Sequence, residues 1–177
     1  MGLFKKKESI KIKDKVWMKK EAKLHSFILE WQKNPNTIFI FWFDDSLRET
    51  ESVFLKQTTA SPLLVTAREV TAQYAAGKKI IIGEHYPLQQ KENDLFQKLK
   101  LNTAEIWSAL DEPLFKQFGS DRIVELMKRL GMKEDESIEH PMITKAIQNA
   151  QAKILKKNLI DSTSISQSDW LLKNLQS

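Results

Sequence analysis

Residues 37–43 read TIFIFWF, and residues 44–49, which follow directly, read DDSLRE. Nearly every side chain of the first stretch is β-branched or aromatic, and polar and apolar residues do not alternate. Such a run is typical of a strand covered on both faces, as in a parallel sheet. The second stretch has the form of a capping box, in which Ser46 and Glu49 satisfy free N–H groups at the start of a helix running to about residue 56. The sequence therefore predicts a buried strand that passes directly into a helix.

The alternation of strand and helix continues toward the C-terminus. Short apolar runs predict strands at residues 63–66, 79–83 and 103–109, and intervening segments predict helices at residues 68–76 and 88–99. Strands that alternate with helices in this way predict an α/β fold with a three-layer, mostly parallel sheet.

The positive charge of the chain is concentrated at its N-terminus. The 177 residues carry a net charge of +5, but residues 1–23 alone hold nine Lys against three acidic residues. Residues 15–32 have apolar side chains at helical spacing and predict a helix. The segment before it is interpreted as a solvated lead-in or as an electrostatic contact with anionic lipid, RNA or an acidic protein. The lysines of this predicted arm are Lys5, Lys6, Lys7, Lys11 and Lys13.

The pattern changes after residue 112. Residues 115–130 and 141–159 have apolar residues at helical spacing, residues 161–168 form a polar stretch, and residues 169–175 predict one last short helix. The predicted organisation is a basic arm at 1–13, an α/β domain at 14–112, a helical extension at 113–160, and a polar linker with a short terminal helix at 161–177.

Composition excludes several classes of protein. The chain has no Cys, which excludes disulfides, thiolate metal sites and a Cys nucleophile. His25, His85 and His140 are too scattered for a zinc motif. No apolar run approaches the ~20 residues of a membrane span, and residues 1–7 lack the pattern of a secretory signal, so a cytoplasmic protein without a transmembrane segment is expected.

Two segments of the C-terminal half resemble a known family. Residues 118–132 read FGSDRIVELMKRLGM, and residues 138–153 read IEHPMITKAIQNAQAK. Both look like the part of the SecA preprotein-translocase motor where the second nucleotide-binding domain passes into the long scaffold helix. A weaker likeness extends over about residues 10–157. The resemblance implies a helicase second-lobe fold, related to P-loop NTPases, and a connection with protein transport.

The sequence departs from that family where the chemistry is expected. The family's second lobe carries an arginine-and-glycine motif that reaches the γ-phosphate, but here residues 93–101, NDLFQKLKL, lead straight into residues 102–105. The five Gly residues also form no phosphate-binding loop. Because a positioned arginine alone contributes about 10³ to 10⁵ in rate to phosphoryl transfer, we expect a protein without ATPase activity, a pseudoenzyme that needs no cofactor.

Three functions remain open at this stage. The first is a protein-interaction module, accessory to translocation, that docks a translocase component or a second copy through the helices of residues 115–155. The second is a metal- or nucleotide-binding enzyme that uses a strand-end cluster of Asp44, Glu84 and His85. The third is a binder of nucleic acid or a membrane surface through the lysine arm. The interaction residues of the first hypothesis are Phe115, Phe118, Arg122, Met127, Ile143 and Ile147.

Overall fold

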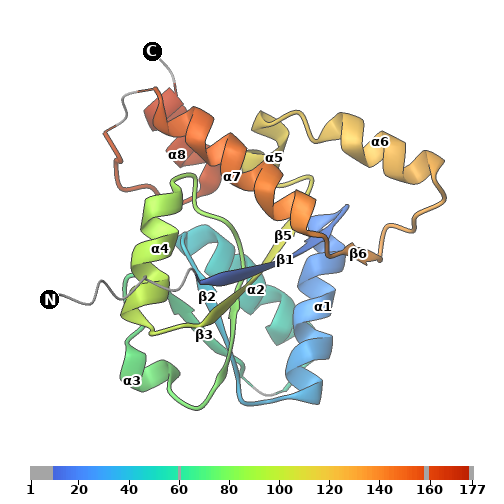
Figure 1. The fold of residues 1–177 in the computed structure, drawn as a ribbon. Coiled ribbons are helices and arrows are strands. Elements are labelled where there is room, and N and C mark those ends of the chain that lie inside the picture. Colours follow the sequence, from blue (N-terminus) through green and yellow to red (C-terminus); the bar gives the residue numbers. More distant parts are fainter. Residues whose placement is uncertain (1–9, 60, 158–159, 176–177) are drawn as a thin grey trace, which may run out of the picture.

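A six-stranded sheet forms the centre of the molecule (Figure 1). The computed structural model describes residues 10–59, 61–157 and 160–175, with Arg122 described by its backbone alone; Lys5, Lys6 and Lys7 lie outside these residues. Neighbouring strands are parallel except for β1 and β6, which are antiparallel. The order across the sheet is β3 (Leu63–Thr66), β2 (Thr37–Phe41), β4 (Lys79–Ile82), β5 (Thr103–Ala109), β1 (Lys11–Trp17) and β6 (Ser137–Ile138).

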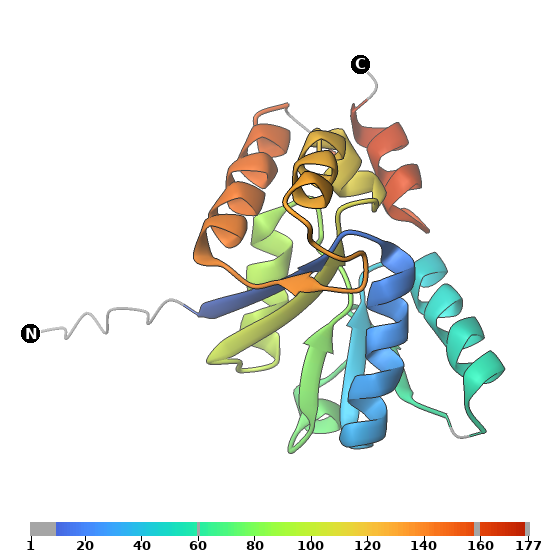
Figure 2. The same cartoon turned by 90° about the vertical axis from the view of Figure 1, so that its right-hand side faces the viewer.

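Helices cover both faces of this sheet, as Figure 2 shows, and the predicted α/β class with a mostly parallel sheet is confirmed. None of the helices in the described ranges combines the length and the apolar character needed to cross a bilayer. The helices are α1 (Lys20–Lys33), α2 (Asp44–Gln57), α3 (Ala72–Ala75), α4 (Gln89–Lys98), α5 (Pro113–Gln117), α6 (Asp121–Arg129), α7 (Pro141–Leu155) and α8 (Gln167–Leu175).

Strand β2 is buried along its whole length and joins two hydrophobic cores. Its even-numbered residues Ile38 and Ile40 pack in the cluster that includes Phe96 of α4. Its odd-numbered residues Phe39 and Phe41 pack with side chains of α1 and α2 on the opposite face. The unbroken apolar run of residues 37–43 is therefore explained by burial on both sides, as predicted from the sequence.

The first element is a strand, and the prediction of a helix from residue 15 is wrong at its start. Residues 11–17 pair in parallel with β5, from Lys11 opposite Thr103 to Trp17 opposite Ala109. Lysines alternate here with Ile12, Asp14 and Val16, which is the two-residue period of a strand. Lys11 and Lys13 belong to the sheet as exposed residues of β1, so the predicted arm does not extend to residue 13.

The predicted capping box of α2 is also wrong. The N-cap residue is Phe43, and its side chain makes no cap hydrogen bond. The Ser46 hydroxyl donates instead to Glu84 Oε2 at 2.6 Å, and Glu49 pairs with Lys20 at 2.9 Å. The helix predicted for residues 68–76 is reduced to the single turn of α3.

The helices after residue 112 remain attached to the sheet. The helix predicted through residues 115–130 is divided into α5 and α6 at Gly119, whose φ of 80° favours glycine. Strand β6 pairs with β1, and α7 packs against β1. Helix α8 starts at Gln167, slightly before its predicted start. The helical extension therefore continues the α/β body.

Gly83, which follows β4, tests how tightly this core is packed. A Cβ atom at this position would clash with the ring of Phe41, which is itself buried. We predict that Gly83→Ala lowers the free energy of unfolding by about 1–3 kcal/mol, the usual cost of overpacking. Urea denaturation measures the effect, with Ala152→Ser at an exposed position of α7 as the control. Equal stabilities of the two variants would contradict the prediction.

Candidate functional site

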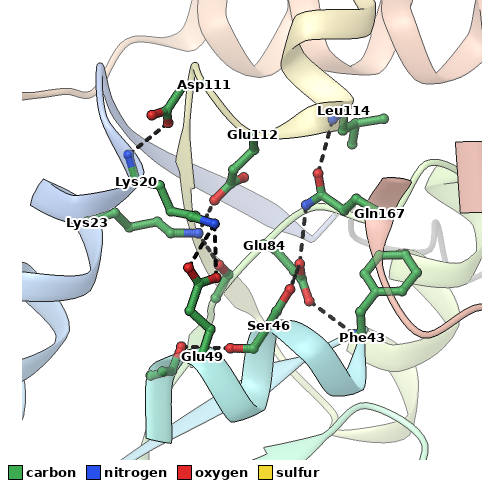
Figure 3. Close-up of polar contacts among 12 residues, drawn as sticks. Lys20, Lys23, Phe43, Ser46, Glu49, Glu84, Asp111, Glu112, Leu114 and Gln167 are labelled. Atoms are coloured by element: carbon green, nitrogen blue, oxygen red, sulfur yellow. Dashed lines mark hydrogen bonds and ion pairs between the residues drawn. The ribbon is translucent and has the colours of Figure 1, made fainter. Parts of the chain in front are cut away.

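The carboxyl ends of the parallel strands meet at one edge of the sheet, called here the rim, and a buried lysine crosses it (Figure 3). Lys23 of α1 donates from Nζ to the carbonyl oxygen of Gly83 at 2.7 Å and pairs with Glu112. The side chains of Lys23 and Glu112 are only 5% and 4% exposed. Because an isolated buried charge is very costly, each of these groups requires the other.

Carboxylates of the chain itself cap the helices that begin at the rim. Asp111 Oδ1 accepts from the backbone N–H of Lys20 at 2.7 Å, at the first residue of α1. Glu84 Oε1 accepts from the backbone N–H groups of Trp42 and Phe43, both at 3.0 Å, directly before α2. Burial raises the pKa of Glu84 to about 7, although the bond from Ser46 and the charge of Lys23 oppose the shift. The N–H groups of Lys20 and Phe43, at helix starts that are natural anion sites, are thus bonded within the chain.

The C-terminal segment closes the same edge. Gln167 of α8 accepts from the backbone N–H of Leu114 at 3.0 Å and donates to Glu84 Oε2 at 3.2 Å. The backbone N–H of Asp45, in the first turn of α2, donates to the carbonyl oxygen of Ile165 at 3.0 Å. Trp170 is fully buried in the cluster that includes Leu114. Residues 165–170 therefore lie across the rim as a packed cover.

His85 belongs to a different network, on the α4 side of the sheet. Its Nε2 lies 2.7 Å from Asp14 Oδ1 and its Nδ1 lies 2.8 Å from Glu92 Oε1, and all three residues are buried. Burial alone lowers the pKa of His85, but the facing carboxylates of Glu92 and Asp14 outweigh it and raise the pKa to about 10. Burial raises the pKa of Asp14, and the imidazolium more than reverses that shift. These three residues form a buried ion triad.

Helix α7 completes the triad's hydrogen bonds. The hydroxyl of Thr144 donates to Asp14 Oδ2, and Gln151 Nε2 donates to Glu92 Oε2 at 3.0 Å. Sequence analysis missed Asp14, Glu92, Lys23 and Glu112. For Asp14, the strict alternation of residues 11–17 was the available signal, because it places Asp14 in the same inward register as Ile12 and Val16.

The predicted cluster of Asp44, Glu84 and His85 does not form one site. Asp44 lies at the surface, where Arg68 Nη2 donates to its Oδ1 at 2.9 Å. Glu84 serves as a helix cap and His85 belongs to the triad. Within the described ranges, no group of three or more His, Asp or Glu side chains is placed to hold a metal ion. The expectation that functional groups lie at the carboxyl ends of the strands identified the correct edge of the sheet. The three side chains nevertheless make separate contacts there.

The predicted interaction residues, by contrast, gather around one apolar groove. Phe115 and Ile147 are buried, and Phe118, Met127 and Ile143 are half-buried. All five line a groove of about 490 Å³ among α5, α6 and α7, whose remaining wall includes Val16 of β1. Arg122 occupies the first turn of α6, and its side chain lies outside the described part of the chain. We call this the α5–α7 groove.

Comparison with known proteins gives one consistent family. The chain is 44% identical over 92 residues to the protein translocase subunit SecA of Acidithiobacillus ferrooxidans, which covers 49% of this chain and 10% of that protein. It is 39% identical over 95 residues to the SecA subunit of Methylococcus capsulatus, covering 51% of this chain and 10% of the relative. About half of the chain is SecA-like. No protein-family model matches it.

The SecA-like chain spans about a tenth of the length of these curated relatives. A shorter match, 48% identical over 56 residues, relates it to the SecA subunit of Syntrophobacter fumaroxidans. Between α4, which ends at Lys98, and β5, which begins at Thr103, only residues 99–102 intervene. The structure therefore has a short turn at the point where the sequence lacks the arginine motif.

Because His85 is the cation of the ion triad, we predict that its replacement strongly lowers the free energy of unfolding. In His85→Gln, Asp14 and Glu92 face each other in the interior without a cation. Breaking a buried ion pair on one side typically costs about 3–5 kcal/mol, and we expect a loss of that order in the free energy of unfolding. His25→Gln, at an exposed position of α1, provides the matched control and is expected to change stability by less than about 0.5 kcal/mol.

The pH dependence of the same variants identifies the charge on His85. The pKa of its imidazole is raised from an ordinary value of 6.5 to about 10 in the folded protein, so its contribution is complete below pH 6.5 and disappears as pH rises toward 10. The wild type should therefore lose stability between about pH 7 and 10, and His85→Gln should lose much less in that window. Parallel stability curves for the two proteins would show that His85 is neutral.

Proposed function

We propose that this SecA-like chain is a non-catalytic interaction module that serves preprotein translocation by protein–protein contact. The observation that carries the proposal is that acceptors of the chain itself bond the backbone N–H groups at the rim. Four backbone N–H groups at the starts of α1, α2 and α5 donate hydrogen bonds to acceptors within the chain. The acceptors are the side chains of Asp111, Glu84 and Gln167 and the carbonyl oxygen of Ile165. Phosphate-binding α/β proteins offer such N–H groups to their ligand. Here they are bonded within the chain.

The space at the rim supports the same conclusion. The cavity beside Lys20, Lys23 and Glu112 holds about 170 Å³. Pockets for drug-sized ligands commonly measure about 300–1,000 Å³. The α5–α7 groove falls within that range at about 490 Å³. The groove therefore offers the larger open surface, and it is lined by the SecA-like residues of the helical extension.

The alternative of nucleotide binding has one feature in its favour. A second cavity, of about 400 Å³, is lined by Arg68, Lys91 and Lys98 beside Trp42 and Tyr86. Its cations already have partners within the chain. Arg68 pairs with Asp44 at 2.9 Å, Lys91 pairs with Asp161 at 3.4 Å, and Lys98 donates to two backbone carbonyl oxygens. We therefore rank this function second.

Nucleotide titration separates the two functions. A ligand with a Kd of about 100 μM, present at 1 mM, stabilises a protein by about 1.4 kcal/mol, which raises the melting temperature by a few degrees. For a non-catalytic module we expect no such shift with ATP and Mg²⁺, and no release of phosphate. A shift that disappears in Lys98→Ala would instead establish nucleotide binding in the second cavity.

Site-specific cross-linking tests the interaction itself. A photoreactive amino acid at Ile123, which is 48% exposed beside the α5–α7 groove, is expected to capture a component of the preprotein-translocation machinery in cells of the source organism. The same probe at Leu55, an exposed leucine of α2, serves as the control. Identical cross-linking patterns from both positions, or no translocation component from Ile123, would contradict the proposed function.

A further inference from the structure

The α5–α7 groove has an uneven distribution of charge around an apolar interior. Most of its lining is aliphatic or aromatic, including Phe115, Ile143 and Ile147, and the charged groups that line it are Lys153 and Lys157. No Asp or Glu among the described residues lines the groove. A carboxylate on the occupant would therefore meet two ammonium groups and no like charge.

The helix that forms one wall adds to this field. Residues 141–157 contain Lys145, Lys153, Lys156 and Lys157 and no acidic residue. All four lysines are exposed. A surface whose charges have one sign attracts an occupant whose charges have the opposite sign. This attraction contributes chiefly to specificity and to the association rate.

The spacing of the apolar side chains indicates the shape of the occupant. Ile143, Ile147 and Ile154 lie along one face of α7, at separations of four and seven residues. On the other wall, α6 presents Ile123 and Met127, four residues apart. Two helices with ridges at these spacings accept a third helix that places its own apolar residues between them. Figure 2 shows α6 and α7 together at the end of the sheet, with one flank of each facing away from the strands.

We infer that the α5–α7 groove binds an amphipathic helix with acidic flanks, and that Lys153 and Lys157 select it over a basic one. This inference rests on the proposed function and specifies the class of partner. The apolar face of the partner enters the groove between α6 and α7. Its carboxylates lie at the α7 end, where the two lysines line the groove.

Two designed peptides of opposite charge test the inference. Each has about 15 residues, with Leu at positions i, i+3, i+4 and i+7 and with either Glu or Lys at the polar positions. Fluorescence anisotropy of labelled peptide measures binding to the full chain. We expect the Glu peptide to bind about tenfold more tightly than the Lys peptide. A ratio of this size corresponds to the contribution of two partly exposed ion pairs.

Charge-reversal variants locate the effect. The double variant Lys153→Glu/Lys157→Glu is expected to lose the preference for the Glu peptide. The control Lys33→Glu/Lys56→Glu changes the net charge equally at exposed positions of α1 and α2, and should retain the preference. Ile123→Ser should lower the affinity for the Glu peptide several-fold. Leu55→Ser, at another exposed apolar residue, should leave this affinity unchanged. Circular dichroism confirms that each variant is folded.

Several outcomes would overturn the inference. Selection by Lys153 and Lys157 would be excluded if the two peptides bound with equal affinity or if neither peptide bound. It would also be excluded if both double variants lost the preference for the Glu peptide to the same extent. A dimer that dissociates in Ile123→Ser would show that a second copy occupies the groove. Failure here remains distinguishable from failure of the proposed function, because cross-linking at Ile123 to a translocation component is scored independently of either peptide.

Discussion

The buried contact of His85 with Asp14 and Glu92 is the interaction on which the arrangement of this molecule depends. It joins β1, the end of β4 and α4, and through Thr144 and Gln151 it also holds α7. One imidazolium between two carboxylates leaves acceptor capacity that only further donors satisfy, and α7 supplies them. A helix fixed by directional bonds has a fixed rotation about its axis. Thr144 and Gln151 face the triad, so Ile143, Ile147 and Ile154 are placed along the groove.

Two sides of the molecule have opposite properties. At the rim, charged and polar groups are plentiful but bonded to one another, as in Lys23 with Glu112 or Glu84 with Ser46 and Gln167. Hydrogen-bonded networks of this kind give order to the fold, and Glu112 Oε2 is buried there without a hydrogen-bond partner. At the α5–α7 groove the polar groups are few, and apolar side chains remain partly accessible. Ile123, which lines the groove, is 48% exposed. Accessible apolar area of this kind drives association.

Local patterns in the sequence predicted the elements whose causes are local. Residues 37–43 form a buried strand because their own side chains fill both cores, and the groove residues share helical spacing that is visible in the chain. The missed polar contacts have long-range causes. Ser46 and Glu49 fit a capping box, but Glu84, 38 residues from Ser46, binds the serine hydroxyl. Lys23 and Glu112 are separated by 89 residues, and His85 and Asp14 by 71. A pair of charges this far apart has no periodicity, so only the topology of the sheet brings its members together.

The same contrast underlies the proposal of a SecA-like docking module without the chemistry of a motor. Phosphoryl transfer requires several cations and donors in one precise constellation, and a loss of one member removes most of the rate. Docking requires an apolar surface of suitable shape with a few charges at its margin, and it tolerates substitution of individual residues. In this chain, residues 99–102 leave no room for the arginine motif, and Asp111 and Glu84 occupy helix starts at the rim. The segment that carries the strongest resemblance is also the segment that forms the α5–α7 groove. Under the proposed function, the SecA-like part of the sequence is thus the part whose role depends on shape.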